Sequence, residues 1–199
     1  MLKRLLDVVA AALGLLLLSP LLLGIALLIK LDSPGPVFFR QVRVGRHGQT
    51  FRIFKFRTMT VAQATDAPEL TVAGDARITR TGAWLRRYKL DELPQLIDVL
   101  QGTMSLVGPR PEVPRYVALY PPELRARVLS VRPGITDLAS ITFRNESELL
   151  ARAADPEREY LQVVMPRKLA LAASYADSPS LAQDLRILWR TLRLLMRGP

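Results

Sequence analysis

The sequence predicts a mostly α-helical protein with one small β-hairpin, held at a membrane by a proline-broken apolar helix near its N-terminus. Three observations predict this fold: a long uncharged apolar run, two alternating segments around a glycine-containing turn, and helical periodicity over much of the rest. The chain has 199 residues, which suits one domain plus an anchor. We therefore expect a membrane helix at 1–31 and one folded domain at 32–199.

The apolar run extends from Val8 to Ile29 without a charged residue. As one helix it would measure about 33 Å, and a hydrocarbon core is about 30 Å thick. Ser19 and Pro20 stand in its middle, where proline removes a helical hydrogen bond and the serine hydroxyl can bond a freed carbonyl.

Basic residues flank this run on both sides, and basic residues favour the cytoplasmic face of a membrane. We therefore interpret the run as a re-entrant helix broken at Ser19 and Pro20. A kinked helix that spans the bilayer is the alternative. A cleaved signal peptide is disfavoured because no small-x-small cleavage site follows the run.

The hairpin is predicted by Val37–Val44 and Thr50–Phe56, which alternate apolar and polar residues on either side of Gly45–Gly48. Its basic side chains are expected to point outward, either into solvent or toward lipid head groups or a phosphate. They are Arg40, Arg43, Arg52, Lys55 and Arg57.

Helical segments are expected in the rest of the chain, with loops at 61–74 and 102–112. The helices are Thr81–Lys89, Asp91–Leu100, Pro121–Val131, Glu146–Ala154, Glu157–Tyr175 (interrupted near Pro166) and Leu181–Arg197. The last has a row of arginines on one face and leucines with Trp189 on another. Such a helix suits a membrane interface, and a core-packing helix with a solvated face is the alternative.

Composition limits the chemistry that this chain can perform. It has no Cys and one His, which excludes disulfides, thiol nucleophiles, Cys-based metal sites and His-rich metal sites. Catalysis must therefore depend mainly on Asp, Glu, Lys, Arg, Ser, Thr, Tyr or a bound metal. The net charge of +10 attracts phosphates on nucleic acid, lipid or a nucleotide.

Two short segments carry candidate functional residues. Asp91 and Glu92 are adjacent carboxylates just before Pro94, where they either cap a helix or hold Mg²⁺ against a phosphate. An ionised Asp can also attack phosphorus. Arg110 lies between two prolines in a stiff loop, which suits a phosphate oxygen pair or a rigid surface turn. Arg132, before Pro133 and Gly134, is a weaker candidate of the same kind.

Taken together, these motifs resemble one family in one order over nearly the whole chain. They are similar to the bacterial sugar transferases, monotopic phosphoglycosyl transferases that use polyprenyl phosphate. The matching segments are Ser19-Pro20, GPVFFRQVRVG (35–45), FKFRTM (54–59), RITRTG (77–82), LDELPQL (90–96), GTMSLVGPRPE (102–112), RPGIT (132–136) and DLRIL (184–188).

The resemblance implies a re-entrant helix and a cytoplasmic catalytic domain on the bacterial inner membrane, with interfacial amphipathic helices. It implies that Asp91 attacks the β-phosphorus of a UDP-sugar, releases UMP and passes the sugar phosphate to polyprenyl (undecaprenyl) phosphate. Asp91 and Glu92 would hold Mg²⁺, with the role of Glu92 left open. The expected phosphate contacts are Arg110 and Arg86, with Lys55, Arg57 and Arg132 as further candidates.

Some features lie outside this resemblance. Asp137 stands where the family usually has Gly, and LASITFRN (138–145) differs from the commoner version of that segment. The chain resembles the short, catalytic-core form of the family. The sequence does not identify the sugar, the polymer or the oligomeric state, a homodimer included.

Two other hypotheses compete with the transferase. One is a membrane-anchored basic nucleic-acid binder, although no nucleic-acid-binding motif is present and no nucleic-acid partner is expected. The other is a non-catalytic membrane scaffold, which would tolerate loss of Asp91.

Overall fold

The computed structural model describes residues 1–61, 70, 72 and 74–196. It is mostly helical, at 61%, with a small antiparallel hairpin, so the coarse fold prediction is confirmed. The loop expected at 61–74 lies mainly outside the described residues, as does Arg197. In chain order the helices are α1 (Leu2–Asp32), α2 (Arg80–Arg87), α3 (Gln95–Gln101), α4 (Pro114–Ala118), α5 (Pro122–Val128), α6 (Leu138–Thr142), α7 (Glu146–Ala151), α8 (Pro156–Glu159), α9 (Met165–Asp177) and α10 (Leu181–Met196).

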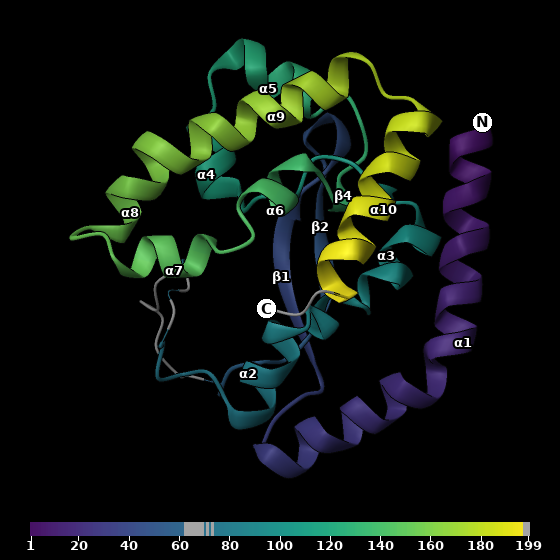
Figure 1. Cartoon of the computed structure of the whole chain (residues 1–199), viewed down its shortest axis with the longest axis vertical. Helices are drawn as coiled ribbons and strands as arrows, with labels where there is room; N and C mark the ends of the chain where they lie inside the picture. Colours follow the sequence, from purple (N-terminus) through teal and green to yellow (C-terminus); the bar gives the residue numbers. More distant parts are fainter. Residues whose placement is uncertain (62–69, 71, 73, 197–199) are drawn as a thin grey trace.

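Helix α1 is a bent apolar helix along one side of the molecule (Figure 1). Pro20 lies inside it, and Ser19 Oγ donates to the carbonyl of Leu16 at 2.8 Å, as expected for a helix that tolerates a proline. The helix is long and apolar enough to cross a membrane, and only 11% of its most apolar window is buried. Most of its leucines are therefore exposed, although Leu15 and Leu22 pack against the folded domain.

The N-terminal arm of α1 is fastened to the folded domain by polar contacts. Lys3 Nζ donates to Asp184 Oδ2 at 2.6 Å and to the carbonyl of Val107 at 3.2 Å. Asp7 is buried, and its Oδ2 accepts from Ser105 Oγ at 2.8 Å. An ion pair to α10 and a hydrogen bond to β3 thus fix the start of α1.

The other end of α1 is capped by Arg57, which follows the hairpin. Its guanidinium donates to the carbonyls of Ser33 at 2.7 Å, Ile29 at 3.4 Å and Pro34. The last carbonyls of a helix have no partner within the helix, and a cation there also favours the helix dipole. Arg57 is only 4% exposed, so the expectation that it points outward is wrong.

The hairpin consists of β1 (Phe38–Val44) and β2 (Thr50–Phe56), with Phe38 opposite Phe56 and Val44 opposite Thr50. The predicted hairpin is confirmed. The side chains of Arg43 and Lys55 are only 20% and 18% exposed, so these two do not point outward as expected. Both belong to the face that is covered by the loops and helices around the pocket described below.

A second pair of strands was not predicted. β3 (Ser105–Val107) and β4 (Gly134–Thr136) pair in parallel, although a loop was expected at 102–112 and no strand was predicted at 134–136. Two glycines permit their close approach: a Cβ on Gly134 would lie 2.1 Å from the nitrogen of Gly108. A Cβ on Gly108 would lie 2.3 Å from the carbonyl oxygen of Arg132. No side chain fits at either position.

Several predicted helices are present with different bounds. The helix expected at Asp91–Leu100 begins only at Gln95, because Leu90–Glu92 forms a 3₁₀ turn of its own. The interruption expected near Pro166 is a π-helical stretch at Tyr160–Val164. The largest hydrophobic cluster is formed mainly by side chains of α4, α5, α7, α9 and this π-helical stretch.

We predict that Arg57→Lys lowers the free energy of unfolding by about 1–3 kcal/mol, because a single ammonium cannot satisfy the carbonyls that the guanidinium reaches. Urea unfolding in detergent micelles measures the change. Arg52→Lys is the matched control, since Arg52 is exposed on the preceding strand. Equal midpoints for the two variants would contradict this role.

Candidate active site

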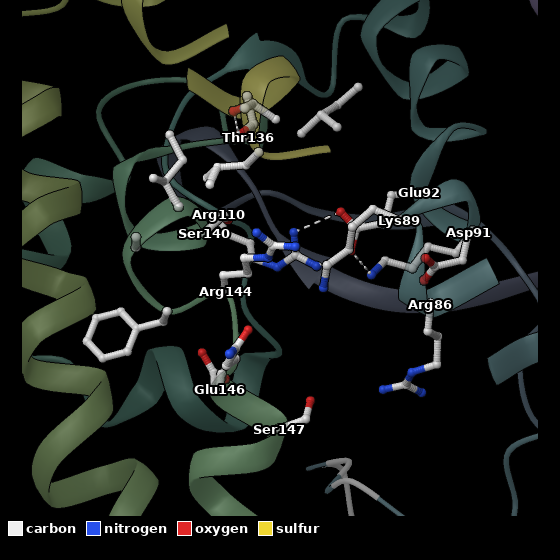
Figure 2. Close-up of a pocket in the computed structure, with 18 of the residues that line it drawn as sticks. Arg86, Lys89, Asp91, Glu92, Arg110, Thr136, Ser140, Arg144, Glu146 and Ser147 are labelled. Carbon is white, nitrogen blue, oxygen red and sulfur yellow. Dashed lines mark hydrogen bonds and ion pairs between the residues drawn. The ribbon is translucent and has the colours of Figure 1, made fainter. Parts of the chain in front are cut away.

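A pocket of about 910 Å³ opens beside the acidic pair, near the upper limit of roughly 1,000 Å³ for small-molecule sites. Figure 2 shows that it gathers side chains from segments far apart in the sequence. The 3₁₀ turn, α2, β2 and the loop after β3 contribute, together with α6, α7 and α10.

The backbone before the acidic pair has an unusual conformation. Lys89 has a φ of 57°, in the left-handed region that few residues other than glycine adopt. It follows the C-terminus of α2 and redirects the chain into the 3₁₀ turn at Leu90–Glu92. Asp91 and Glu92 consequently both line the pocket. Strained backbone of this kind is typical of functional sites.

Glu92 is held between two cations. Its Oε1 lies 2.8 Å from Lys55 Nζ and also accepts from Arg110 Nη2, while its Oε2 accepts from Arg110 Nη1 at 3.0 Å. Figure 2 shows the guanidinium of Arg110 directed at this carboxylate. The arrangement is a bidentate pair with an ammonium added, which is the strong form of a charge-assisted hydrogen bond.

Asp91 has the opposite environment. It is 9% exposed, and its Oδ1 is buried without a hydrogen-bond partner. Among the residues that the structure describes, this is the single carboxylate oxygen in that condition. A buried acceptor without a partner is costly, so its presence at the pocket indicates an atom kept available for a ligand or a reaction.

The two carboxyl groups differ in pKa accordingly. Burial raises the pKa of Asp91 above its ordinary value, and the charge of Glu92 raises it further. Burial would also raise the pKa of Glu92, but Arg110 and Lys55 bring it well below its ordinary value. The pKa of Lys55 is lowered by burial, although Glu92 opposes that change. Glu92 is therefore the permanently ionised member of the pair.

The loop that carries Arg110 is fixed by Asp137. Asp137 Oδ2 accepts from the Arg110 backbone nitrogen at 3.2 Å, and its Oδ1 accepts from the Ser140 backbone nitrogen at 2.6 Å. Asp137 therefore caps the N-terminus of α6 and anchors the arginine loop at the same time. Sequence reasoning left the effect of this residue open.

The structure gathers most of the predicted site residues in the pocket. Those that line it are Lys55, Arg86, Asp91, Glu92 and Arg110. Arg57 does not line it, because its guanidinium caps α1. Arg132 does not line it either, since its Nε donates to the carbonyl of Gly102 at 2.9 Å. The expectation that these two arginines contact the substrate is not supported by their positions.

Sequence reasoning missed a second polar group behind Arg110. Arg43 Nη1 donates to Glu112 Oε2 at 3.3 Å, and Tyr160 OH donates to Glu112 Oε1 at 2.7 Å. Lys168 Nζ lies 3.5 Å from the same Glu112 oxygen. The alternation of the hairpin could have predicted the position of Arg43, because the pairing register puts it on the same face as Lys55. Nothing local in the sequence connects it to α9.

A magnesium ion fits this pocket through one carboxylate. Magnesium is often held by one or two carboxylates together with substrate phosphates. Oδ1 of Asp91 is available for such a bond, whereas both oxygens of Glu92 already face cations. Among the described residues, no three Asp, Glu or His side chains gather as a protein-only metal site.

Comparison with known proteins gives the family. The bacterial sugar transferase family model matches residues 1–198. A UDP-glucose:undecaprenyl-phosphate glucose-1-phosphate transferase of Caulobacter vibrioides is 44% identical over 98% of this chain and 69% of its own length.

Two longer relatives are also similar. A transferase of the same name from Escherichia coli is 39% identical over 96% of this chain. A UDP-N-acetylgalactosamine-undecaprenyl-phosphate N-acetylgalactosaminephosphotransferase of Aeromonas hydrophila is 38% identical over 98% of it. The chain spans only 39% and 44% of the length of these two proteins. The match over the whole chain nevertheless shows that this protein belongs to the bacterial sugar transferase family.

Proposed function

We propose that this protein transfers a sugar 1-phosphate from a UDP-sugar to polyprenyl phosphate, with Asp91 as the nucleophile. The names of the relatives support the reaction class. The observation that carries the assignment of Asp91 is its buried Oδ1, which lacks a hydrogen-bond partner although cationic side chains surround the pocket. The neighbouring Glu92 is bound on both oxygens and is a poorer nucleophile for that reason.

In the first half of the reaction, an oxygen of Asp91 attacks the β-phosphorus of the UDP-sugar. The bond between that phosphorus and the bridging oxygen breaks, and UMP leaves with the bridging oxygen. A sugar phosphate remains joined to the carboxyl group as an acyl phosphate. Burial favours this step, because a desolvated carboxylate is more reactive than a hydrated one.

In the second half, a phosphate oxygen of polyprenyl phosphate attacks the same phosphorus atom. The bond to Asp91 breaks, the carboxylate is regenerated, and polyprenyl-diphosphate-sugar is released. Both halves use one phosphate position, so the cations that line the pocket serve both substrates in turn.

Arg110, Lys55 and Arg86 are the cations that we assign to the phosphates. Glu92 holds the first two through its ion pairs, so its role is to position them. When bound, Mg²⁺ would neutralise phosphate charge, and Asp91 is the side chain that would hold it.

We further propose that α1 is re-entrant. Lys3 and Asp7 tie its N-terminal arm to the folded domain, and Arg57 ties its other end to the same domain. From Pro20 to Asp32 the helix is about 18 Å long, which is shorter than a hydrocarbon core of about 30 Å. This arm is too short to cross the core, so the bend would lie inside the bilayer, with both ends on the cytoplasmic face of the inner membrane.

Asp91→Asn should reduce turnover on the order of 10³-fold or more, because the amide cannot act as the nucleophile. UMP release with a panel of UDP-sugars, undecaprenyl phosphate and Mg²⁺ measures turnover, and mass spectrometry of the quenched parent enzyme should find the sugar phosphate on Asp91.

The Asp91→Asn variant should be at least as stable as the parent, because a buried carboxylate without a partner is removed. Glu123→Gln, on the exposed side of α5, is the control for both measurements. Full turnover by Asp91→Asn would contradict the mechanism and favour the hypothesis of a non-catalytic membrane scaffold.

The pH dependence gives a test with a definite sign. Turnover should fall as the pH decreases through the raised pKa of Asp91, since the protonated acid is not nucleophilic. Lys55→Met removes a cation that lowers this pKa, so the acid limb should move to higher pH. Glu92→Gln removes a charge that raises it, so the limb should move to lower pH. Arg52→Met is the control, and shifts in the same direction for both variants would contradict the assignment.

Topology can be tested by labelling, because the chain has no native cysteine. In inside-out vesicles, a water-soluble maleimide should label Leu2→Cys and Ser178→Cys alike. Leu17→Cys, 76% exposed on α1, should stay protected by lipid. Protection of Leu2→Cys, with labelling only from the opposite face, would establish a spanning helix instead.

A further inference from the structure

We propose that the apolar lobe of the pocket, beneath α10, binds the first isoprenoid units of the lipid acceptor. This inference rests on the proposed function and adds a location for the tail of one substrate. The lobe is defined by six side chains from three regions of the chain. They are Leu106 from β3, Ile135 and Ile141 from β4 and α6, and Leu188, Leu194 and Leu195 from α10.

Charged and apolar side chains both line the pocket. Glu146 and Ser147 lie at one end and Thr136 at the other, with Arg110 between them (Figure 2). The six apolar side chains of the lobe belong to β3, β4, α6 and α10, the elements around Thr136. A ligand that fits the whole pocket is therefore an amphiphile with an anionic group near Arg110.

The position of α10 over this lobe is fixed. Ile187 is buried, and Thr191 Oγ1 lies 2.8 Å from Thr136 Oγ1, which joins the helix to β4. The next turn of α10 then carries Leu194, which is half-buried, and Leu195, which is 43% exposed. The lobe therefore reaches the surface at the C-terminal end of α10.

The outer face of α10 indicates where the occupant comes from. Leu185, Trp189 and Leu192 are each more than half exposed, and arginines at 186, 190 and 193 accompany them. Apolar side chains beside cations suit the surface of an anionic bilayer. A prenyl tail could leave that bilayer at the end of α10 and enter the lobe while its phosphate reaches Arg110. The UDP-sugar has no apolar tail that would use this lobe.

Two matched pairs of substitutions separate the lobe from general membrane affinity. Leu194→Gln with Leu195→Gln alters the lobe, and Leu185→Gln with Leu192→Gln alters the outer face of the same helix. Both double variants remove two leucines. With undecaprenyl phosphate in mixed micelles, we expect the first pair to raise the KM for the acceptor roughly tenfold and leave the KM for the UDP-sugar unchanged.

The second pair should leave both KM values near those of the parent. An equal rise of the acceptor KM in both pairs, or no rise in the first, would overturn the proposal. No transfer by the parent protein would instead refute the proposed function itself.

A binding measurement gives an answer that does not depend on turnover. A prenyl phosphate with a diazirine on its first isoprene unit should crosslink to α10 between Leu188 and Leu195. Crosslinks confined to α1 would overturn the proposal. Thermal unfolding of each double variant shows whether α10 remains packed.

Discussion

The ion pairs of Glu92 with Arg110 and Lys55 are the interactions on which the rest of the site depends. Bringing three charges into a half-buried position costs free energy of desolvation, and good geometry with several hydrogen bonds offsets it. The arrangement gives the two adjacent acids different roles. Glu92 is ionised and fully occupied, while Asp91 Oδ1 remains without a partner. If neither carboxylate were paired with cations, both negative charges would repel a substrate phosphate.

This arrangement requires that the loop with Arg110 face the 3₁₀ turn with Glu92. The loop follows β3, so the pairing of β3 with β4 fixes where it begins. Two three-residue strands are too short to be stable alone, so neighbours must hold them. The surroundings of the Val107 carbonyl show how: Lys3 Nζ of α1 donates to it, and the hydroxyls of Ser105 in β3 and Tyr175 in α9 lie 3.0 Å and 3.1 Å from it. The strand that leads to Arg110 is thus also the strand that α1 contacts through Lys3.

Local patterns predicted the parts of the fold that local forces determine. The apolar helix, the hairpin and α10 each follow from a periodicity within one segment, and Asp91, Glu92 and Arg110 from short motifs. The parallel pairing of β3 with β4 leaves no such signal, because each strand has three residues and the two are distant in sequence. The role of Arg57 could not be predicted for a similar reason. Its partners are backbone carbonyls of the segment before the hairpin, and every residue has a backbone carbonyl, so no motif marks them.

Two unfavourable features lie close together in the turn before α3. Lys89 has a left-handed backbone, and two residues later Asp91 buries an oxygen without a partner. Each is unfavourable in the free protein, and each persists because a rigid surround fixes it. A ligand that supplies positive charge or a phosphorus electrophile would relieve the second one, because it would give Asp91 Oδ1 the partner that it lacks. The unfavourable conformation and burial at this turn support the proposal that Asp91 is the reacting residue.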